Sequence, residues 1–195
     1  MLRHNFLSQH DQRSLVEQVI RLTRSAPFYQ PVMPRSGKPF SVEQTNFGEL
    51  GWISDSGGYR YSPVQPKTGM PWPAIPEILK DLWQTVAQYP FAAQCCLVNL
   101  YRVGAKMGLH QDRDETNVDA PVVSVSLGDA AVFRFGGTQR KNPTQSVKLT
   151  SGDVLIFGGT ARRMFHGIDR VIGGSSTLVS DGRRINLTLR RVTPA

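Results

Sequence analysis

Arg184-Ile185-Asn186-Leu187-Thr188-Leu189-Arg190 is the stretch of this 195-residue sequence with the strictest alternation of polar and apolar side chains. Successive side chains of a β-strand point to opposite faces of the sheet. The stretch therefore predicts a strand with one apolar face on the core and one polar face. A solvated outer face would explain the polar stripe. However, the strand from Arg184 to Arg190 spans only about 20 Å, and two guanidinium groups on the same face could together bind the two carboxylates of a dicarboxylate.

Short segments rich in β-forming residues, punctuated by Gly, Asp, Asn or Pro, fill the C-terminal half of the chain. Eight of them are expected to form strands, at about 96–101, 122–127, 131–135, 147–149, 154–157, 165–168, 177–179 and 184–192. This pattern predicts a jelly roll or a related barrel.

The N-terminal half has a different pattern. Apolar residues at helical spacing predict an amphipathic helix that ends before Pro27, and a second helix between Pro76 and Pro90. Residues 31–73 are dense in Pro, Gly, Ser and aromatic residues, which favours turns and short ribbons. The fold class expected for the whole chain, 1–195, is mainly β with flanking helices (α+β) in a single domain.

Composition narrows the classes of function. The formal net charge of +8 suits a polyanionic partner such as nucleic acid, although a solvated basic surface has the same charge. Cys95 and Cys96 are adjacent, too close for an ordinary disulfide, and are expected to be reduced core thiols. No signal peptide or segment of roughly 18 apolar residues is present, so we expect a cytoplasmic protein that makes no membrane contact. Nothing in the sequence resembles a dimerisation segment, and we expect a monomer.

A histidine and a carboxylate, His110 and Asp112, lie two residues apart in Gly108-Leu109-His110-Gln111-Asp112. On a strand, both side chains would point to one face, as a metal site requires. A histidine hydrogen-bonded to a nearby aspartate would show the same pair. His166, in Phe165-His166-Gly167, is a candidate third ligand, and the three residues predict a two-histidine, one-carboxylate iron site with open coordination positions.

These motifs resemble those of the AlkB family of iron(II)- and 2-oxoglutarate-dependent dioxygenases, most closely its bacterial DNA-repair members. The matching blocks keep their order from about residue 3 to residue 191 and comprise 45–52, 58–63, 71–73, 99–101, 110–115, 124–128, 133–137, 166–168 and 184–190. The resemblance implies a double-stranded β-helix (jelly-roll) core at about 95–192. It also implies an N-terminal nucleotide-recognition lid at about 31–73.

The resemblance also assigns the cofactor site. His110, Asp112 and His166 would hold iron(II) and leave positions for 2-oxoglutarate and dioxygen, the two co-substrates. Arg184 would bind the distal carboxylate of 2-oxoglutarate and Arg190 would lie near the metal end. The residues that would assist are Asn99, Tyr101 and Asn186.

The implied reaction is oxidative demethylation of bases such as 1-methyladenine or 3-methylcytosine, with release of formaldehyde, succinate and carbon dioxide. The partner would be single-stranded or duplex DNA, with RNA as a second nucleic acid. Trp52 would stack on the flipped base, which Asp114 would contact. Flanking and further substrate contacts would come from Tyr59, Arg60, Tyr61 and Arg140.

Three positions depart from the family pattern. Phe157 stands where the best-known bacterial members have tryptophan, and Phe40 and Gln44 replace apolar lid residues, which affects the expected base preference. Other interpretations remain: a hydroxylase of the same chemistry acting on RNA, protein or a small molecule, or a non-catalytic jelly-roll binding module. Taken singly, the aromatic residues could be packing residues, Asp114 a loop cap and Arg140 a surface charge.

Overall fold

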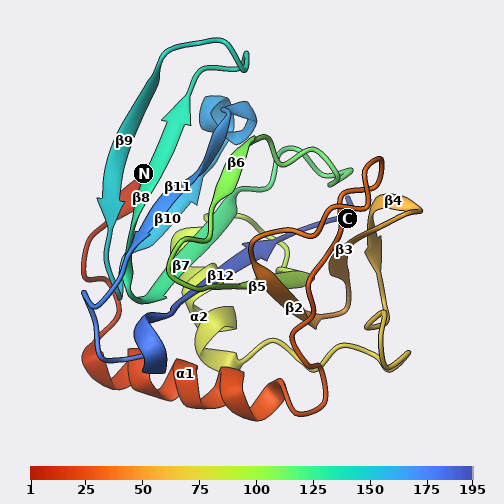
Figure 1. Cartoon of the computed structure of the whole chain (residues 1–195), viewed down its shortest axis with the longest axis horizontal. Coiled ribbons are helices and arrows are strands. Elements are labelled where there is room, and N and C mark those ends of the chain that lie inside the picture. Colours follow the sequence, from red (N-terminus) through yellow and green to blue (C-terminus); the bar gives the residue numbers. More distant parts are fainter. Residues whose placement is uncertain (195) are drawn as a thin grey trace.

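Two antiparallel β-sheets face each other in the computed structural model, which describes residues 1–194 (Figure 1). The major sheet has six strands, in the order β1 (Leu2–Arg3), β10 (Val154–Phe157), β7 (Val122–Gly128), β12 (Arg184–Arg190), β5 (Cys95–Tyr101) and β2 (Glu43–Gly48). The minor sheet has four, in the order β6 (Met107–His110), β11 (His166–Ile172), β8 (Ala130–Gly136) and β9 (Thr144–Leu149). This arrangement confirms the expected jelly-roll core.

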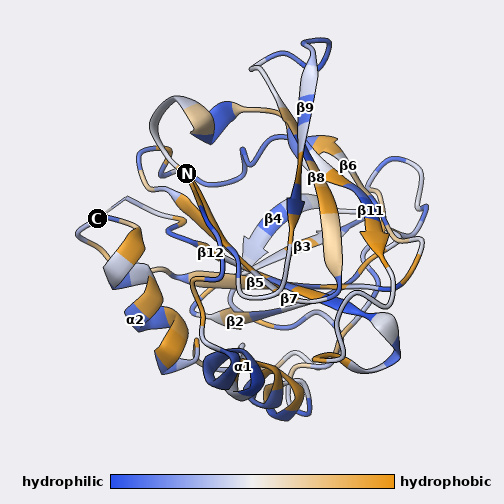
Figure 2. Cartoon of the chain, turned by 90° about the vertical axis from the view of Figure 1, so that its left-hand side faces the viewer, coloured by the Kyte–Doolittle hydropathy of each residue, from blue (hydrophilic) through white to orange (hydrophobic). Residues whose placement is uncertain are grey.

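Two helices cover the outer face of the major sheet. Helix α1 (Gln9–Leu22) begins at Ser8, whose side chain accepts a hydrogen bond from the Asp11 backbone N–H, and α2 (Glu77–Val86) follows Pro76. The apolar face of β12 packs in the same core cluster as these helices. Figures 1 and 2 show both helices on the side of the major sheet that lies away from β8 and β9.

The opposite face of β12 points between the two sheets. Pairing with β5 and β7 runs the full length of the strand, from Arg184 opposite Tyr101 and Gly128 to Arg190 opposite Cys95 and Val122. The inter-sheet space therefore receives the polar stripe at 184, 186, 188 and 190. An apolar cluster that includes Phe133 and Phe157 fills part of the same space.

The 31–73 segment divides into two parts. Its strand β2 pairs with β5 and completes the edge of the major sheet. Strands β3 (Gly51–Asp55) and β4 (Gly58–Ser62) instead form a separate two-stranded ribbon. Turns and short ribbons were expected here, and the structure confirms them while adding the strand in the sheet.

Several sequence-based strand assignments were wrong. Residues 177–179 form no strand, because the buried carboxylate of Asp129 accepts hydrogen bonds from the backbone N–H groups of Gly174 and Ser176 and holds this segment as a loop. The last strand ends at Arg190 rather than 192. His110 and Asp112 were expected on one strand, but β6 ends at His110 and Asp112 lies in the loop that follows.

Both cysteines are buried free thiols, as expected. Burial raises the pKa of the Cys95 thiol to about 12, which keeps it protonated and unreactive. No helix within residues 1–194 has the length and apolar character needed to cross a bilayer.

Gly167→Ala is expected to destabilise the fold, because a Cβ at this position would lie 2.4 Å from the backbone carbonyl oxygen of Met107 in the neighbouring strand. The two strands would have to separate, at a cost of about 1–3 kcal/mol in the free energy of unfolding. Urea denaturation measures this loss. Gly108→Ala is the matched control, because a Cβ there meets nothing within 4 Å; equal stabilities of the two variants would contradict the explanation.

Candidate metal centre and active-site cavity

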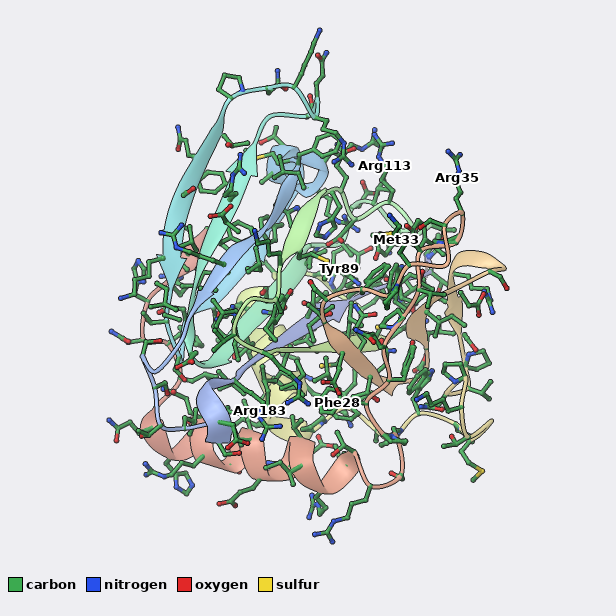
Figure 3. The ribbon with its side chains drawn as sticks, in the orientation of Figure 1. Phe28, Met33, Arg35, Tyr89, Arg113 and Arg183 are labelled. Carbon is green, nitrogen blue, oxygen red and sulfur yellow. The ribbon has the colours of Figure 1, made fainter. Side chains whose placement is uncertain are left out.

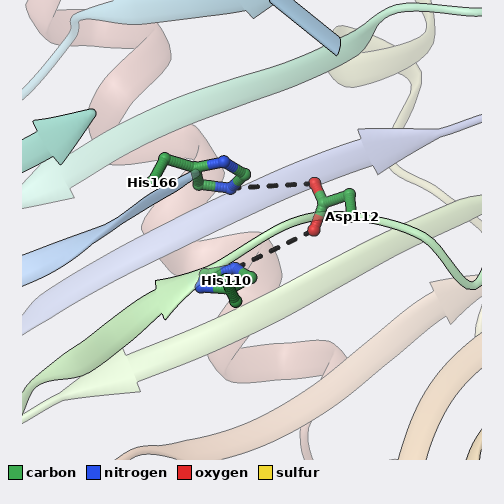
Figure 4. A group of neighbouring side chains, drawn as sticks. All are labelled: His110, Asp112 and His166. Carbon is green, nitrogen blue, oxygen red and sulfur yellow. Dashed lines mark ion pairs between the residues drawn. The ribbon is translucent and has the colours of Figure 1, made fainter. Parts of the chain in front are cut away.

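Three side chains converge where the ends of β6 and β11 meet. His110 ends β6 and pairs with His166, the first residue of β11, while Asp112 follows in the loop. The Asp112 carboxylate lies between the two rings, 3.8 Å from Nε2 of His110 and 3.9 Å from Nε2 of His166 (Figure 4). One ligand atom from each residue falls within 4.8 Å of the others, so the group could hold a metal ion.

Backbone carbonyl groups orient both imidazole rings. Nδ1 of His110 lies 2.8 Å from the Gly108 carbonyl oxygen, and Nδ1 of His166 lies 3.0 Å from that of Met164. A neutral imidazole that donates from Nδ1 presents a lone pair on Nε2. Both Nε2 atoms therefore face the Asp112 carboxylate as ligands, in the arrangement that fixes histidine at metal centres.

The local electrostatics favour the ligand forms of Asp112 and His166. Burial by itself would raise the pKa of Asp112, but Arg190, and the two histidines when they are protonated, outweigh it and hold the pKa well below its usual value. Burial lowers the pKa of His166, against the opposing effect of Asp112. An ionised carboxylate with neutral imidazole is the donor set that a divalent metal needs. Two histidines and one carboxylate fit iron(II) with open positions.

Two buried arginines from β12 flank this centre. Arg190 donates from Nη2 to Asp112 Oδ1 at 2.9 Å. Arg184, at the other end of the strand, is 0 % exposed and donates to Ser126 Oγ at 2.8 Å and to the Asp129 carbonyl oxygen at 3.3 Å. Its Nε has no hydrogen-bond partner.

No carboxylate within residues 1–194 forms an ion pair with Arg184, although Asp153 acts on its charge from beyond ion-pair distance. Burial lowers the pKa of this guanidinium to about 10, so the group is still a cation at neutral pH. Burial also raises the pKa of the neighbouring Tyr101 hydroxyl to about 12 and keeps it neutral. Because burying an uncompensated charge is costly, this end of the stripe is suited to an anionic ligand.

A cavity of about 740 Å³ joins these groups. The three candidate ligands, both arginines, and the expected assisting residues Asn99, Tyr101 and Asn186 all line it. Asn99 accepts a hydrogen bond from Gln44 Nε2 at 2.7 Å, and the amide of Asn186 donates to Ser124 Oγ at 2.8 Å. The cofactor-site residues expected from sequence thus line one cavity.

The mouth of the cavity has an aromatic wall. Trp52 of β3 stacks on Tyr59 of β4, with ring centroids 5.5 Å apart and planes at 18°. The Phe40 ring is tilted by 46° to the Trp52 ring, with centroids 6.3 Å apart. The indole Nε1 donates to Asp114 Oδ2 at 2.7 Å, which connects the ribbon to the loop after β6. All four side chains line the cavity.

Of the other expected substrate residues, only Arg140 lines the cavity. Arg60 pairs with Asp55 through both Nη atoms at 2.7 Å and does not line the cavity. Tyr61 points inward, where its hydroxyl donates to Glu115. Arg140 lines the cavity with its guanidinium 5.1 Å from the centroid of the Phe165 ring. For these residues, nucleic-acid contact stays a prediction.

Sequence reasoning gave no role to two buried charged residues beside the centre, Glu115 and Arg162. They form an ion pair of 2.9 Å with side chains 2 % and 4 % exposed. The sequence contains only a weak signal for Glu115, its place in the 110–115 block, and none for Arg162. Phe157, a departure from the family pattern, stacks on the His166 ring at 4.9 Å.

Comparisons with known proteins agree with this geometry. The family model described as "2OG-Fe(II) oxygenase superfamily" matches residues 1–190. The "Alpha-ketoglutarate-dependent dioxygenase AlkB homolog" of Caulobacter vibrioides is 54 % identical over 184 residues, 94 % of this chain and 83 % of that protein. The "Alpha-ketoglutarate-dependent dioxygenase AlkB" of Escherichia coli is 45 % identical over 183 residues, 90 % of this chain and 84 % of that protein.

A solved structure, titled "The structure of OsALKBH1", aligns with a TM-score of 0.84 and 32 % identity, covering 97 % of this chain and 95 % of that one. Sequence, fold and donor set thus agree. The chain belongs to the 2OG-Fe(II) oxygenase superfamily and is an enzyme that uses iron(II), 2-oxoglutarate and dioxygen.

Proposed function

We propose that this protein is an oxidative demethylase of N-alkylated bases in nucleic acid, with 1-methyladenine and 3-methylcytosine in DNA as first substrates. One observation carries the proposal: the candidate metal ligands, the buried Arg184 with no ion-pair partner, and the Trp52–Asp114 pair all line one cavity. The candidate cofactor site and an aromatic surface suited to a nucleobase therefore lie in the same cavity. The names of two further relatives, a "DNA N(6)-methyladenine demethylase ALKBH1C" of Arabidopsis thaliana and a "tRNA demethylase abh1" of Schizosaccharomyces pombe, support demethylation of nucleic acid.

His110, Asp112 and His166 would hold iron(II). Together with 2-oxoglutarate and dioxygen, the metal would supply the oxidation of the alkyl group. Arg184, whose Nε has no partner, would bind the distal carboxylate of 2-oxoglutarate, and the neutral hydroxyl of Tyr101 would donate a hydrogen bond to it. Because Gln44 donates to Asn99 Oδ1, the amide nitrogen of Asn99 remains a donor for the ligand. Arg190 and Asn186 complete the polar lining.

The substrate part of the cavity suits a flipped, cationic base. Trp52 offers a flat face, which Tyr59 supports by stacking on it. Asp114 accepts one hydrogen bond from the Trp52 indole, and a carboxylate has capacity for more. It can therefore also accept from the exocyclic amine of the base, while its charge favours an N-methylated cation. The hydroxymethyl group formed there leaves as formaldehyde.

Positive charge near the cavity would attract the phosphate backbone. Arg113 lines the cavity, and Figure 3 shows Arg35 and Arg113 extending from the ribbon on the same upper side of the molecule. With a net charge of +8, this favours single-stranded or duplex DNA, and RNA as a second nucleic acid. The buried thiols fit a cytoplasmic enzyme, and we propose that it acts as a monomer.

An oligonucleotide bearing 1-methyladenine is expected to yield formaldehyde and succinate in equal amounts when incubated with the enzyme, iron(II), 2-oxoglutarate and dioxygen. Formaldehyde and succinate are quantified in parallel on DNA and RNA, single-stranded and duplex, with the unmethylated oligonucleotide as control. Succinate without demethylation would indicate another prime substrate. Metal-loaded enzyme that forms no succinate with any of them would contradict the proposal.

His110→Ala is expected to lower turnover by more than about 100-fold, since even residues that merely support a ligand contribute about 10–100-fold. The free energy of unfolding of the metal-free protein should stay within about 1 kcal/mol of wild type, because the His110 side chain is 39 % exposed. Formaldehyde release and urea denaturation measure the two effects. His10→Ala, at an exposed histidine of α1, is the control. A His110→Ala enzyme with wild-type turnover would exclude this ligand.

Arg184→Gln is expected to raise the KM for 2-oxoglutarate by about 10- to 100-fold, because it removes a charge-assisted hydrogen bond worth about 1.5–3 kcal/mol. Steady-state succinate formation at varied 2-oxoglutarate measures the KM. The adjacent Arg183 pairs with Asp181 and does not line the cavity, so Arg183→Gln is the control. Equal KM values for the two variants would remove Arg184 from the binding site.

A further inference from the structure

Arg162 connects the two chain segments that carry the candidate ligands. It lies in η1 (Gly159–Arg163), the 3-10 turn that precedes His166. Its Nη1 donates to the backbone carbonyl oxygen of Asp112 at 2.9 Å, and its Nε donates to that of Ala120 at 3.2 Å. One buried side chain thus holds the ligand loop from the segment before β11.

Glu115 connects this arginine to the second one. Its Oε2 accepts from Arg162 Nη2 at 2.9 Å, and its Oε1 lies 3.3 Å from Arg190 Nε and accepts from the Tyr61 hydroxyl. Arg190 in turn donates to Asp112 Oδ1 at 2.9 Å. The four residues form a closed ring of two cations and two anions that holds Asp112 by its backbone and by its carboxylate.

This ring replaces the support that a strand would give. Asp112 lies beyond the end of β6, so no sheet hydrogen bonds fix its backbone. A ligand on such a loop needs other contacts to keep its carboxylate at the metal, and hydrogen bonds to ligand residues tune metal affinity. The side chain of Gln111 adds a further link, because it donates to the carbonyl oxygens of Thr138 and Arg163.

We propose that Arg162 and Glu115 are positioning residues that preorganise Asp112 for the metal. This inference rests on the proposed assignment of His110, Asp112 and His166 as ligands. Neither residue needs to contact the metal or the substrate for this role. A purely structural ion pair would affect the stability of the fold and leave the metal affinity of the folded protein unchanged.

Arg162→Lys separates these two roles. Lysine keeps the charge beside Glu115 but has no planar fork to reach both that carboxylate and the Asp112 carbonyl oxygen. We expect the variant to bind Mn(II), a non-turnover probe, about 10- to 100-fold more weakly than wild type. The Kd is measured on metal-free protein from the electron paramagnetic resonance signal of free Mn(II), and urea denaturation establishes that the variant is folded.

The matched control is Arg163→Lys, the neighbouring arginine, whose side chain is exposed. If the single substitution prevents folding, the double variant Arg162→Met with Glu115→Gln is used instead. It removes both charges of the pair, so no uncompensated charge is left at that pair. It too should weaken Mn(II) binding, with an altered absorption spectrum of the Co(II)-loaded protein.

Folded Arg162 variants that bind Mn(II) with the wild-type Kd would overturn the positioning role while leaving the metal assignment intact. A His110→Ala protein that binds Mn(II) as tightly as wild type would instead overturn the metal assignment, and this inference with it.

Discussion

Strand β12 pairs along its full length with β5 on one side and β7 on the other, and the rest of the site depends on this double pairing. With both edges occupied, the strand cannot slip, because a shift of one residue would turn Ile185, Leu187 and Leu189 toward the cavity and bury Arg184 and Arg190 against the helices. The packing of the apolar face of β12 in one core cluster with α1 and α2 thus fixes the position of the two arginines.

Buried charge is the second constraint, and the two ends of β12 meet it differently. At the Arg190 end, the carboxylates of Asp112 and Glu115 compensate the charges of Arg190 and Arg162 within the protein. At the Arg184 end, Ser126 and a backbone carbonyl group supply the polar contacts, with no carboxylate in ion-pair range. The metal end is therefore compensated within the protein, and the far end is the one that we propose binds the anionic co-substrate.

The same cavity also joins two structural layers. The metal candidates come from the ends of minor-sheet strands and the loop after β6, whereas Trp52 and Tyr59 come from the separate β3–β4 ribbon. The Trp52–Asp114 hydrogen bond connects the ribbon to that loop. The surface proposed to bind the base is thus held directly next to the candidate ligands.

The sequence alone determined what depends on local periodicity and on residue type. The alternation at 184–190 predicted the two faces of β12, and the two histidines with one carboxylate predicted the donor set. The tertiary structure decided what depends on distant neighbours: that Tyr61 points inward, that Asp129 holds 177–179 as a loop, and that Arg162 and Glu115 support Asp112. Local spacing cannot reveal such contacts, because they form only when segments far apart in the chain are brought together by the packing of the two sheets.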